Sequence, residues 1–492
     1  MSLCSGVLVD RRQFLKTTGL TALAANIPLG EPVSAARSRA ADYTVRIATS
    51  LVEVGPQRFL SLTTYNGAFP GPLLRFREGR EVIIDIFNDT DVPEQLHWHG
   101  QLVGDSVDGA LEEGTPYILP HSMRREVFVP RPSGFRFYHT HVRAGLDLNR
   151  GLYGGEVGPV YIEPAHDIGA YDREVFLTLK EFEPFFSQGG DMDLQFLSPA
   201  TQDPELRARG ESAMRASLAQ GMKKGFEVGY RIFTVNGRQL GFGEPVRVKR
   251  GERVLFHVLN GSATEIRSLA LPGHMFKVMA LDGNPVPHSS EVPVLWLGTA
   301  ERVSAIVEMN HPGVWVMGDL DDDDRQRGMG IIIEYAGERG KPVWRTPPPF
   351  SWDYRRFADQ DREPPPLDET LDVLIEKDNA ADHGFNRWML NGVAFDSKIM
   401  PVSQHLVRGR RYRLRMRNAS DDVHPIHLHR NRFELTRIAG APTAGVLKDV
   451  AMLGGYQIME VDFIADQPGL TLFHCHAQLH MDYGFMSLFQ TA

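Results

Sequence analysis

Ten of the eighteen histidines are gathered in four short segments of the sequence. These segments are His97-Trp98-His99, His139-Thr140-His141, His424-Pro425-Ile426-His427-Leu428-His429, and His474-Cys475-His476 with His480. In a β-strand, residues i and i+2 lie on one face about 6.6 Å apart, so a His-x-His pair can present both imidazoles to neighbouring metal ions. A single pair most often belongs to a satisfied core, but four pairs in one chain indicate metal binding.

Cys475 lies between two of these histidines, so strand alternation sends its thiol to one face and His474 and His476 to the other. One thiolate would then sit between two metal sites. Copper suits imidazole and thiolate ligands, and two histidines, one cysteine and a weak axial position form a blue-copper site. The predicted ligands are Cys475, His480 and His424. Zinc is the rival metal, but ten histidines with one cysteine do not resemble a structural zinc site.

The elements that must position these residues are predicted to be β-strands. Alternating, β-branched segments end at Gly, Pro, Asn or Asp, as in the segment 81–87 before Asn88, which is typical of a β-sandwich. Two phrases, that is, recurring sequence patterns, each occur three times. In the first phrase, a basic residue and a glycine precede a strand that ends in asparagine and is followed by a histidine. In the second phrase, a glycine precedes an aromatic-rich strand. The first phrase begins at 77, 250 and 408, and the second at Gly134, Gly313 and Gly469.

These repeats predict three homologous domains. The middle copy has Gly318, Asp319 and the acidic run Asp321 to Asp324 where the other two have histidines, so we expect it to have lost its metal. The predicted boundaries are 41–165, 166–340 and 370–492, with a stiff proline-rich linker at 341–369. An insertion between Glu183 and Val228, helical around 211–224, is interpreted as a solvated excursion, with a lid over a substrate site as the alternative.

The beginning of the chain reads as an export signal. Arg11-Arg12-Gln13-Phe14-Leu15-Lys16 precedes a short apolar stretch, which resembles a twin-arginine signal covering residues 1–40. We therefore expect the twin-arginine machinery as a partner and a periplasmic or secreted location. No later segment reaches the length of about 20 apolar residues that a membrane span needs. The net charge of -9 argues against nucleic acid as the main partner.

Taken together, the four histidine motifs resemble those of the multicopper oxidases, the family of laccases, ascorbate oxidase and bacterial copper oxidases. The resemblance covers the whole chain after residue 40. It implies an all-β fold of three consecutive cupredoxin-like Greek-key β-sandwich domains holding four copper ions. The type 1 copper would lie in the last domain, and three coppers would lie between the first and last. His97 and His427 would hold the type 2 copper, and the type 3 pair would be held by His99, His139, His141, His429, His474 and His476.

The resemblance also implies an activity and the residues that serve it. One-electron oxidations of a reducing substrate at the type 1 site would be matched to the four-electron reduction of dioxygen to water. The expected catalytic residues are Cys475 and His480 in the electron path and Asp108 as a proton donor. An Asp-Gly turn is the competing interpretation of Asp108. Several bacterial relatives place a second acid directly after the last histidine, where this chain has Met481, and Asp482 cannot simply replace it.

A second departure concerns the axial position of the type 1 site. The family spacing places Phe485 there, as a non-ligand that should raise the potential of the copper, with Met486 as the alternative. We predict Phe485 as the axial neighbour and Met486 as core packing.

These features leave two classes of reductant. Phenols or aromatic amines, as in laccases, are the leading hypothesis. The alternative is a periplasmic metallo-oxidase for Cu(I), Fe(II) or Mn(II), although the insertion holds only Met192, Met214 and Met222. A copper-free structural protein is disfavoured because every ligand is present, and a two-domain nitrite reductase because a third repeat is present.

Overall fold

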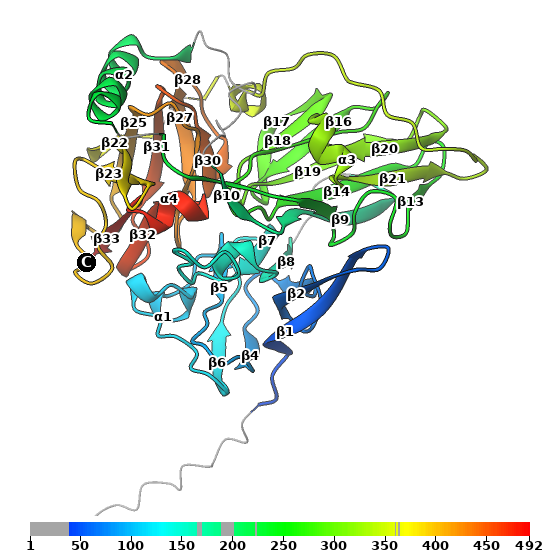
Figure 1. Cartoon of the computed structure of the whole chain (residues 1–492), viewed down its shortest axis with the longest axis horizontal. Coiled ribbons are helices and arrows are strands. Elements are labelled where there is room, and N and C mark those ends of the chain that lie inside the picture. The colour runs from blue at the N-terminus through cyan, green and yellow to red at the C-terminus, as the bar shows by residue number, and fades with distance from the viewer. Residues whose placement is uncertain (1–38, 165–169, 188–200, 222–223, 360, 363–364) are drawn as a thin grey trace, which may run out of the picture. The chain divides into compact units, whose positions relative to one another are not determined.

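The computed structural model describes residues 39–164, 170–187, 201–221, 224–359, 361–362 and 365–492. Within residues 41–492, which form one compact unit, the strands pair into three successive two-sheet groups, coloured blue to cyan, green, and yellow to red in Figure 1. Each group is a β-sandwich, as the sequence predicted. The boundaries predicted between the domains stay a prediction.

The first sandwich consists of the sheets β2-β1-β4-β6 and β3-β8-β7-β5. Its elements are β1 (Tyr43–Gly55), β2 (Arg58–Tyr65), β3 (Leu74–Arg77), β4 (Val82–Asn88), β5 (His97–His99), α1 (Asp105–Asp108), β6 (Ser122–Phe128), β7 (Gly134–His139) and β8 (Val157–Glu163).

The second sandwich consists of the sheets β12-β9-β14-β19-β16-β17 and β13-β21-β20-β15-β18. Its elements are β9 (Arg173–Phe182), β12 (Ile232–Val235), β13 (Val246–Val248), β14 (Arg253–Asn260), β15 (Arg267–Ala270), β16 (Phe276–Leu281), β17 (Asn284–Val292), β18 (Val294–Leu297), β19 (Arg302–Glu308), β20 (Val314–Gly318), α3 (Asp322–Gln326) and β21 (Gly330–Tyr335).

The third sandwich consists of the sheet β23-β22-β25-β31-β27-β28, with β29 added to β27, and the sheet β24-β33-β32-β26-β30. Its elements are β22 (Glu369–Asp382), β23 (Phe385–Leu390), β24 (Val402–Leu406), β25 (Arg411–Asn418), β26 (His424–Leu428), β27 (Phe433–Ile438), β28 (Ala441–Pro442), β29 (Leu447–Lys448), β30 (Val450–Leu453), β31 (Ile458–Ile464), β32 (Gly469–Cys475), α4 (Gln478–Asp482) and β33 (Met486–Thr491).

The asparagine of the first phrase makes equivalent hydrogen bonds in all three sandwiches. The Asn88 amide donates to the carbonyls of Val92 and Ile118, at 2.8 and 2.9 Å. Asn260 and Asn418 each donate in the same way to a carbonyl four or five residues on and to a distant one, at 2.8–3.0 Å. Because a buried loop must satisfy its backbone groups, one amide that ties two loops together explains why the phrase recurs.

The described helix of the insertion after β9 is mostly exposed, as a solvated excursion would be, but it is docked on the third sandwich. Its hairpin strands β10 (Phe185–Ser187) and β11 (Glu227–Gly229) flank α2 (Pro204–Ala219), which begins earlier than the sequence suggested. Leu206 of α2 is buried against Ala419 and Tyr456 of the third sandwich, and the Arg209 guanidinium bonds to Glu376 of β22 at 2.6 and 2.9 Å. The helix is therefore docked beside β22, as Figure 1 also shows.

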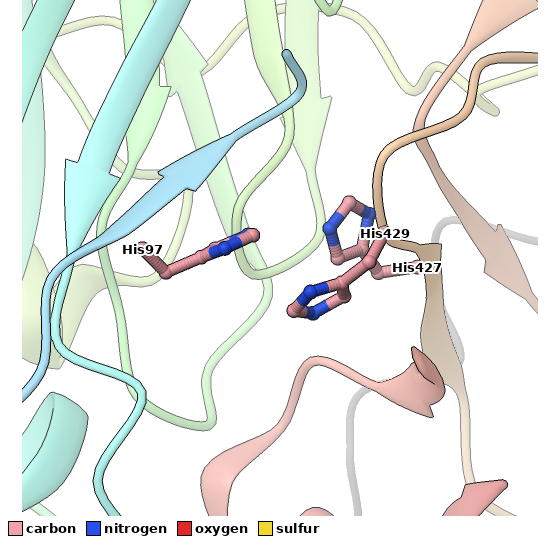
Figure 2. A group of neighbouring side chains, drawn as sticks. All are labelled: His97, His427 and His429. Carbon is pink, nitrogen blue, oxygen red and sulfur yellow. The ribbon is translucent and has the colours of Figure 1, made fainter. Parts of the chain in front are cut away.

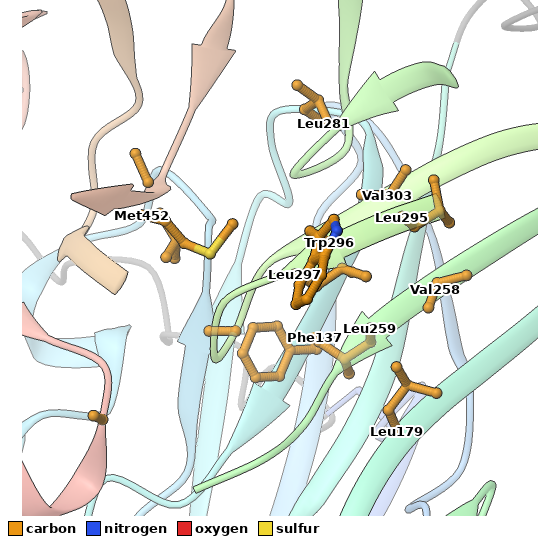
Figure 3. Packing of buried hydrophobic residues seen from close by; sticks show 14 of the residues in the cluster. Phe137, Leu179, Val258, Leu259, Leu281, Leu295, Trp296, Leu297, Val303 and Met452 are labelled. Carbon is orange, nitrogen blue, oxygen red and sulfur yellow. The ribbon is translucent and has the colours of Figure 1, made fainter. Parts of the chain in front are cut away.

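The largest buried apolar cluster is continuous across the three sandwiches. Figure 3 shows Phe137 of β7, Leu297 of β18 and Met452 of β30, one from each sandwich, within this cluster. The close approach of Gly134 to the backbone of Gly283 joins the first and second sandwiches, and each of these glycines has a positive φ. The sandwiches are thus packed together, which fixes side chains from different domains against one another.

Candidate metal centre

Two equivalent strand pairs deliver the histidine motifs. In the first sandwich His97 of β5 lies directly opposite His139 of β7, and in the third His427 of β26 lies opposite His474 of β32. In the middle sandwich the matching pair of β15 and β20 is Ala270 and Gly318. The middle domain therefore has two small residues at the position where each of the others has two imidazoles.

Eight buried histidines from the first and third sandwiches come together in one group. Figure 2 shows His97 of β5 with its ring turned towards His427 and His429, which come from β26 and the residue after it. The ring centroids of His97 and His429 are 4.1 Å apart, and those of His99 and His427 are 3.9 Å apart. Ligand nitrogens of several triplets lie close enough to hold a metal ion. The eight are His97, His99, His139, His141, His427, His429, His474 and His476.

Most of these rings are anchored through one nitrogen. Nδ1 of His97, His139, His427 and His474 bonds to a backbone carbonyl at 2.7–2.8 Å, and Nδ1 of His429 bonds to an Asp108 oxygen at 2.8 Å. His99 is anchored differently, because its Nε2 lies 3.1 Å from Oδ1 of Asp449. Anchoring one nitrogen fixes the orientation of the ring and leaves the other nitrogen free to act as a ligand.

The free nitrogens fit a bound metal. Nε2 of His97 and of His427, and both ring nitrogens of His141 and His476, are buried without a hydrogen-bond partner among the described residues. A buried polar group without a partner is costly, so six such nitrogens in one cluster call for an ion. Burial and the neighbouring imidazoles lower the pKa of His99, His139, His141, His427, His429 and His476 well below the usual value, and the pKa of His474 to about 4. These rings are therefore neutral at pH 7, as metal ligands must be.

A second group lies in the third sandwich, around Cys475 at the end of β32. Its Sγ is 3.6 Å from Nδ1 of His424 and 3.5 Å from Nδ1 of His480, and the two nitrogens are 3.2 Å apart. All three side chains are buried. Burial raises the pKa of the Cys475 thiol, so a cation is needed to hold the thiolate at neutral pH. The donor set of two imidazoles and one sulfur is the one that copper prefers.

The two candidate axial residues point to different surroundings. The Phe485 ring is fully buried, 4.8 Å from the ring of His424 and 5.8 Å from that of Trp388. The Met486 side chain packs instead in a separate apolar cluster with Phe395 and Leu472. Trp388 also covers His480, with the two ring centroids 4.4 Å apart.

Comparison with known proteins agrees with this donor set. Family models described as multicopper oxidase match residues 49–166, 209–332 and 363–492. The multicopper oxidase MmcO of Mycobacterium tuberculosis is 27% identical over 486 residues, covering 95% of this chain and 90% of its own length.

The chain belongs to the multicopper oxidase family.

Two solved structures of the family share the fold. The laccase of Botrytis aclada superposes with a TM-score of 0.71 at 18% identity, covering 91% of this chain and 87% of its own. A metallo-oxidase of Campylobacter jejuni gives a TM-score of 0.67 at 18% identity, with 91% of each chain covered. The predicted class of three cupredoxin-like Greek-key β-sandwich domains is confirmed. As a multicopper oxidase the protein is a copper-dependent oxidoreductase with dioxygen as its electron acceptor.

In this multicopper oxidase, Asp108 lies at the Asp-Gly turn and also contacts the histidine group. It is the last residue of α1, and Gly109 caps that helix with a φ of 99°. Its carboxylate Oδ2 also lies 2.8 Å from Nδ1 of His429 and 3.0 Å from Nδ1 of His97. Burial would raise the pKa of Asp108, but its contacts with His97 outweigh burial and lower the pKa to about 2.

Further acids at the histidine group escaped the sequence reasoning, and Glu113 and Asp449 are two of them. Oε1 of Glu113 accepts the Leu472 N–H at 2.5 Å and lies 3.7 Å from Nδ1 of His429, and burial raises the Glu113 pKa well above its usual value. In the sequence, the feature that could have pointed to Glu113 was its position five residues after Asp108. Asp449, beside His99, gave no signal because no motif surrounds it.

Asp482 bonds to the loop that follows His141. Its carboxylate accepts the backbone N–H groups of Ala144 and Gly145 at 3.0 and 2.7 Å. Burial raises the pKa of Asp482 to about 6.

The predicted twin-arginine signal, including Arg11 and Arg12, falls on residues 1–38, outside the described residues. Within the part of the chain that the structure describes, no helix is long and apolar enough to cross a bilayer.

Proposed function

We propose that this multicopper oxidase holds four copper ions at the two groups. Cys475, His424 and His480 would hold the type 1 ion. His97 and His427 would hold the type 2 ion. The type 3 pair would be held by His99, His139, His141, His429, His474 and His476. Bound copper supplies one-electron redox chemistry with the reductant at the first group and reduction of dioxygen at the second. The nitrogens without partners and the separate sulfur-containing group support this assignment.

The observation that carries the proposal is the continuity of β32 between the two groups. The Cys475 side chain belongs to the first group, while its chain neighbours His474 and His476 belong to the second. The sulfur and the imidazoles of both neighbours are thus joined by a few covalent bonds. We infer that this segment is the electron path, with His480 or His424 on the side of the reductant.

Protons for the reduction of dioxygen would come through Asp108 and Glu113. The contacts with His97 outweigh burial and lower the pKa of Asp108 to about 2, so its carboxylate is ionised and accepts hydrogen bonds from the groups around it. Glu113, whose pKa is raised by burial and by the charge of Asp108, stays protonated and supplies the proton. This pair refines the expectation that Asp108 alone is the donor.

The surroundings of His424 favour a small reductant. Nε2 of His424 lies 3.0 Å from Oγ of Ser420, and Ser420 lines a cavity of about 60 Å³ beneath α2. Glu376, Asp378, Asp421 and Met214 line the same cavity, together with Arg209 and Lys377, which pair with Glu376 and Asp421. Cavities for organic ligands usually measure about 300–1,000 Å³. Of the two reductant classes, the geometry therefore supports a metal ion such as Cu(I) or Fe(II) better than a phenol.

Phenols and aromatic amines stay the second candidate because of the residues beneath the type 1 group. Phe485 and Trp388 surround His424 and His480 with apolar rings, and a non-coordinating axial residue favours the high potential that organic reductants require. Met192 and Met222 of the insertion lie outside the described residues.

Oxygen uptake by the copper-loaded protein tests the function. Copper content and the absorption spectrum should be measured first, and then Cu(I), Fe(II), a phenol and an aromatic amine should be offered separately. We expect about four coppers per chain, a blue band, and faster uptake with a metal ion than with the organic donors. Cys475→Ser should lose the blue band. A protein that gives neither a blue band nor oxygen uptake would refute the proposal.

We also propose export by the twin-arginine route to the periplasm or beyond, supported by Arg11-Arg12 and the apolar stretch that follows. Cell fractionation with and without an Arg11→Lys, Arg12→Lys double variant checks this location.

A further inference from the structure

One buried carboxylate joins all three sandwiches at the histidine group. Asp449 follows β29 in the third sandwich and is 1% exposed. Its Oδ1 lies 3.1 Å from Nε2 of His99 in the first sandwich. Arg302, the first residue of β19 in the second sandwich, donates through Nη1 to Oδ1 at 2.7 Å and through Nη2 to Oδ2 at 2.6 Å. Arg302 thus connects the domain without a histidine pair to the group.

The two parallel bonds from Arg302 fix the plane of the carboxylate. A bidentate pair of this kind sets direction as well as position, and here it aims Oδ1 at His99. Arg136 of β7 adds a third bond, from Nη1 to Oδ2 at 3.1 Å. Arg302 is itself held by the Ala300 carbonyl at 2.8 Å, so the guanidinium has little freedom to turn.

The middle sandwich also holds the backbone of Asp449. Oδ2 of Asp282, on the loop between β16 and β17, accepts the N–H groups of Asp449 and Val450 at 3.2 and 3.1 Å. Oδ1 of the same Asp282 accepts the Arg302 N–H at 3.0 Å. The Asp449 carbonyl accepts from Nδ1 of His427 at 2.7 Å. One residue thus orients two imidazoles, His99 by its side chain and His427 by its backbone.

Gly100 packs closely against the pair of Asp449 and Arg302. Gly100, next to His99, has a φ of 75°, and a Cβ there would lie 2.5 Å from Oδ2 of Asp449 and 2.8 Å from Nη2 of Arg302. The glycine of the His-Trp-His-Gly motif is therefore required both by its backbone conformation and by the ion pair against it.

His99 depends on this anchor more than its neighbours do. The five other anchored rings of the group, among the residues described, are held through Nδ1, by four carbonyls and by Asp108. His99 is held through Nε2, which leaves its Nδ1 facing Nε2 of His139 at 3.3 Å. Which nitrogen of His99 carries the proton is thus decided by Asp449.

We propose that Arg302 of the copper-free domain is a positioning residue, which sets the orientation and the ligating nitrogen of His99 through Asp449. The proposal rests on the ligand assignment proposed above. It gives the middle domain a role at a centre to which it contributes no ligand. Partners that orient a metal ligand typically change metal affinity or activity by about 10–100-fold when they are replaced.

Arg302→Lys tests this role, because it keeps the charge and removes the bidentate bond. Arg267→Lys is the matched control, since Arg267 is a buried arginine of the same sandwich whose partners, Glu181 and Asp324, lead to no histidine of the group. Both variants are compared with the wild-type protein in copper content, blue absorption and the electron paramagnetic resonance of the copper at the histidine group. The midpoint of thermal unfolding is measured on the copper-free proteins.

We expect Arg302→Lys to keep the blue band, because Cys475, His424 and His480 do not contact Arg302. It should hold copper at the histidine group about 10–100-fold more weakly and alter the resonance of that group. Arg267→Lys should bind copper as the wild type does, whatever its thermal midpoint. Arg302→Lys with wild-type copper content and resonance would overturn the proposal.

Two further results are distinguishable from that one. A wild-type protein that binds no copper at the histidine group would refute the proposed function itself. If Arg302→Lys does not fold, Asp449→Asn gives the same comparison, because an amide cannot offer two acceptor oxygens to Arg302. Asp449→Asn that folds and holds full copper with an unchanged resonance would overturn the proposal as well.

Discussion

Single side chains decide the character of the type 1 group. Phe485, the residue before β33, lies against the ring of His424, whereas Met486, the first residue of β33, packs with Phe395 and Leu472. Phe485 is therefore the one of the two that faces the Cys475 group. The side chain that faces it cannot ligate copper, which favours a high potential.

Replacing Phe485 should therefore change the potential, and replacing Met486 should not. Phe485→Met offers a thioether to the type 1 copper and is expected to lower its potential measurably. Met486→Leu keeps the volume of a packing residue and should leave the potential as it is. Redox titration of the blue band measures both. A shift with Met486→Leu alone would mean that Met486 is the axial residue.

The sequence could predict the ligands because each motif is short and local. Every pair, from His97-Trp98-His99 to His474-Cys475-His476, begins on a strand, and three of the four pairs end just beyond it. Asp449 and Arg302 could not be predicted, because their contact joins residues 147 positions apart and no spacing rule connects them. Glu113 was missed because burial, which the sequence does not show, is the largest cause of its raised pKa.

At the scale of elements, the position of α2 affects the width of the cavity beside Ser420. The helix begins at Pro204, and the side chain of Asp203 before it accepts the N–H groups of Glu205 and Leu206 at 3.0 Å. Gly210 lies so close to the Ala419 carbonyl that a Cβ would clash with it. The absence of that side chain lets the helix lie directly on the third sandwich and narrows the cavity beside Ser420.

Gly210→Val should move α2 away from Ala419 and widen that cavity. We expect turnover of a bulky phenol to rise several-fold relative to Cu(I), with the blue band unchanged because no residue of the Cys475 group is touched. Ala208→Val, on the exposed side of the same helix, is the control and should alter neither rate. Equal phenol turnover in the two variants would show that the cavity does not limit the reductant.

The docking of α2 is also where sequence reasoning fell short at this scale. A polar, charged helix such as 204–219 is typical of a solvated surface, and the residues that hold it, such as Leu206 and Gly210, are few. The repeated strands were predictable because the same phrase occurs three times in the sequence. The position of the insertion depends on Ala419 and Tyr456, far along the chain.

For the whole molecule, the many neutral histidines make the copper-free protein sensitive to acid. The pKa of His474 and of His480 is lowered by burial to about 4, and that of His476 falls well below its usual value, while an unfolded histidine titrates near 6.5. Between about pH 6.5 and 4 the unfolded chain thus binds protons that the folded chain does not. By linkage, stability is lost as the pH falls through this window.

Removing one of these histidines should make the free energy of unfolding less dependent on pH. For His476→Asn we expect the loss of unfolding free energy between pH 6.5 and 5 to shrink by up to about 1.4 kcal/mol per pH unit. His383→Asn is the control, because the side chain of His383 is 94% exposed. Denaturation of the copper-free variants at several pH values measures both slopes. Identical slopes in the two variants would contradict the assignment of neutral buried rings.

The strand pairs that carry the histidines have a consequence for the order of events during synthesis. His97 and His139 leave the ribosome more than 300 residues before His474 and His476, and the type 1 group needs both His424 and Cys475. A chain that has emerged only as far as β31 can therefore build neither group, although its first two sandwiches are complete. The two groups need residues as late in the chain as His476 and His480, so neither group can be complete before those residues have been synthesised.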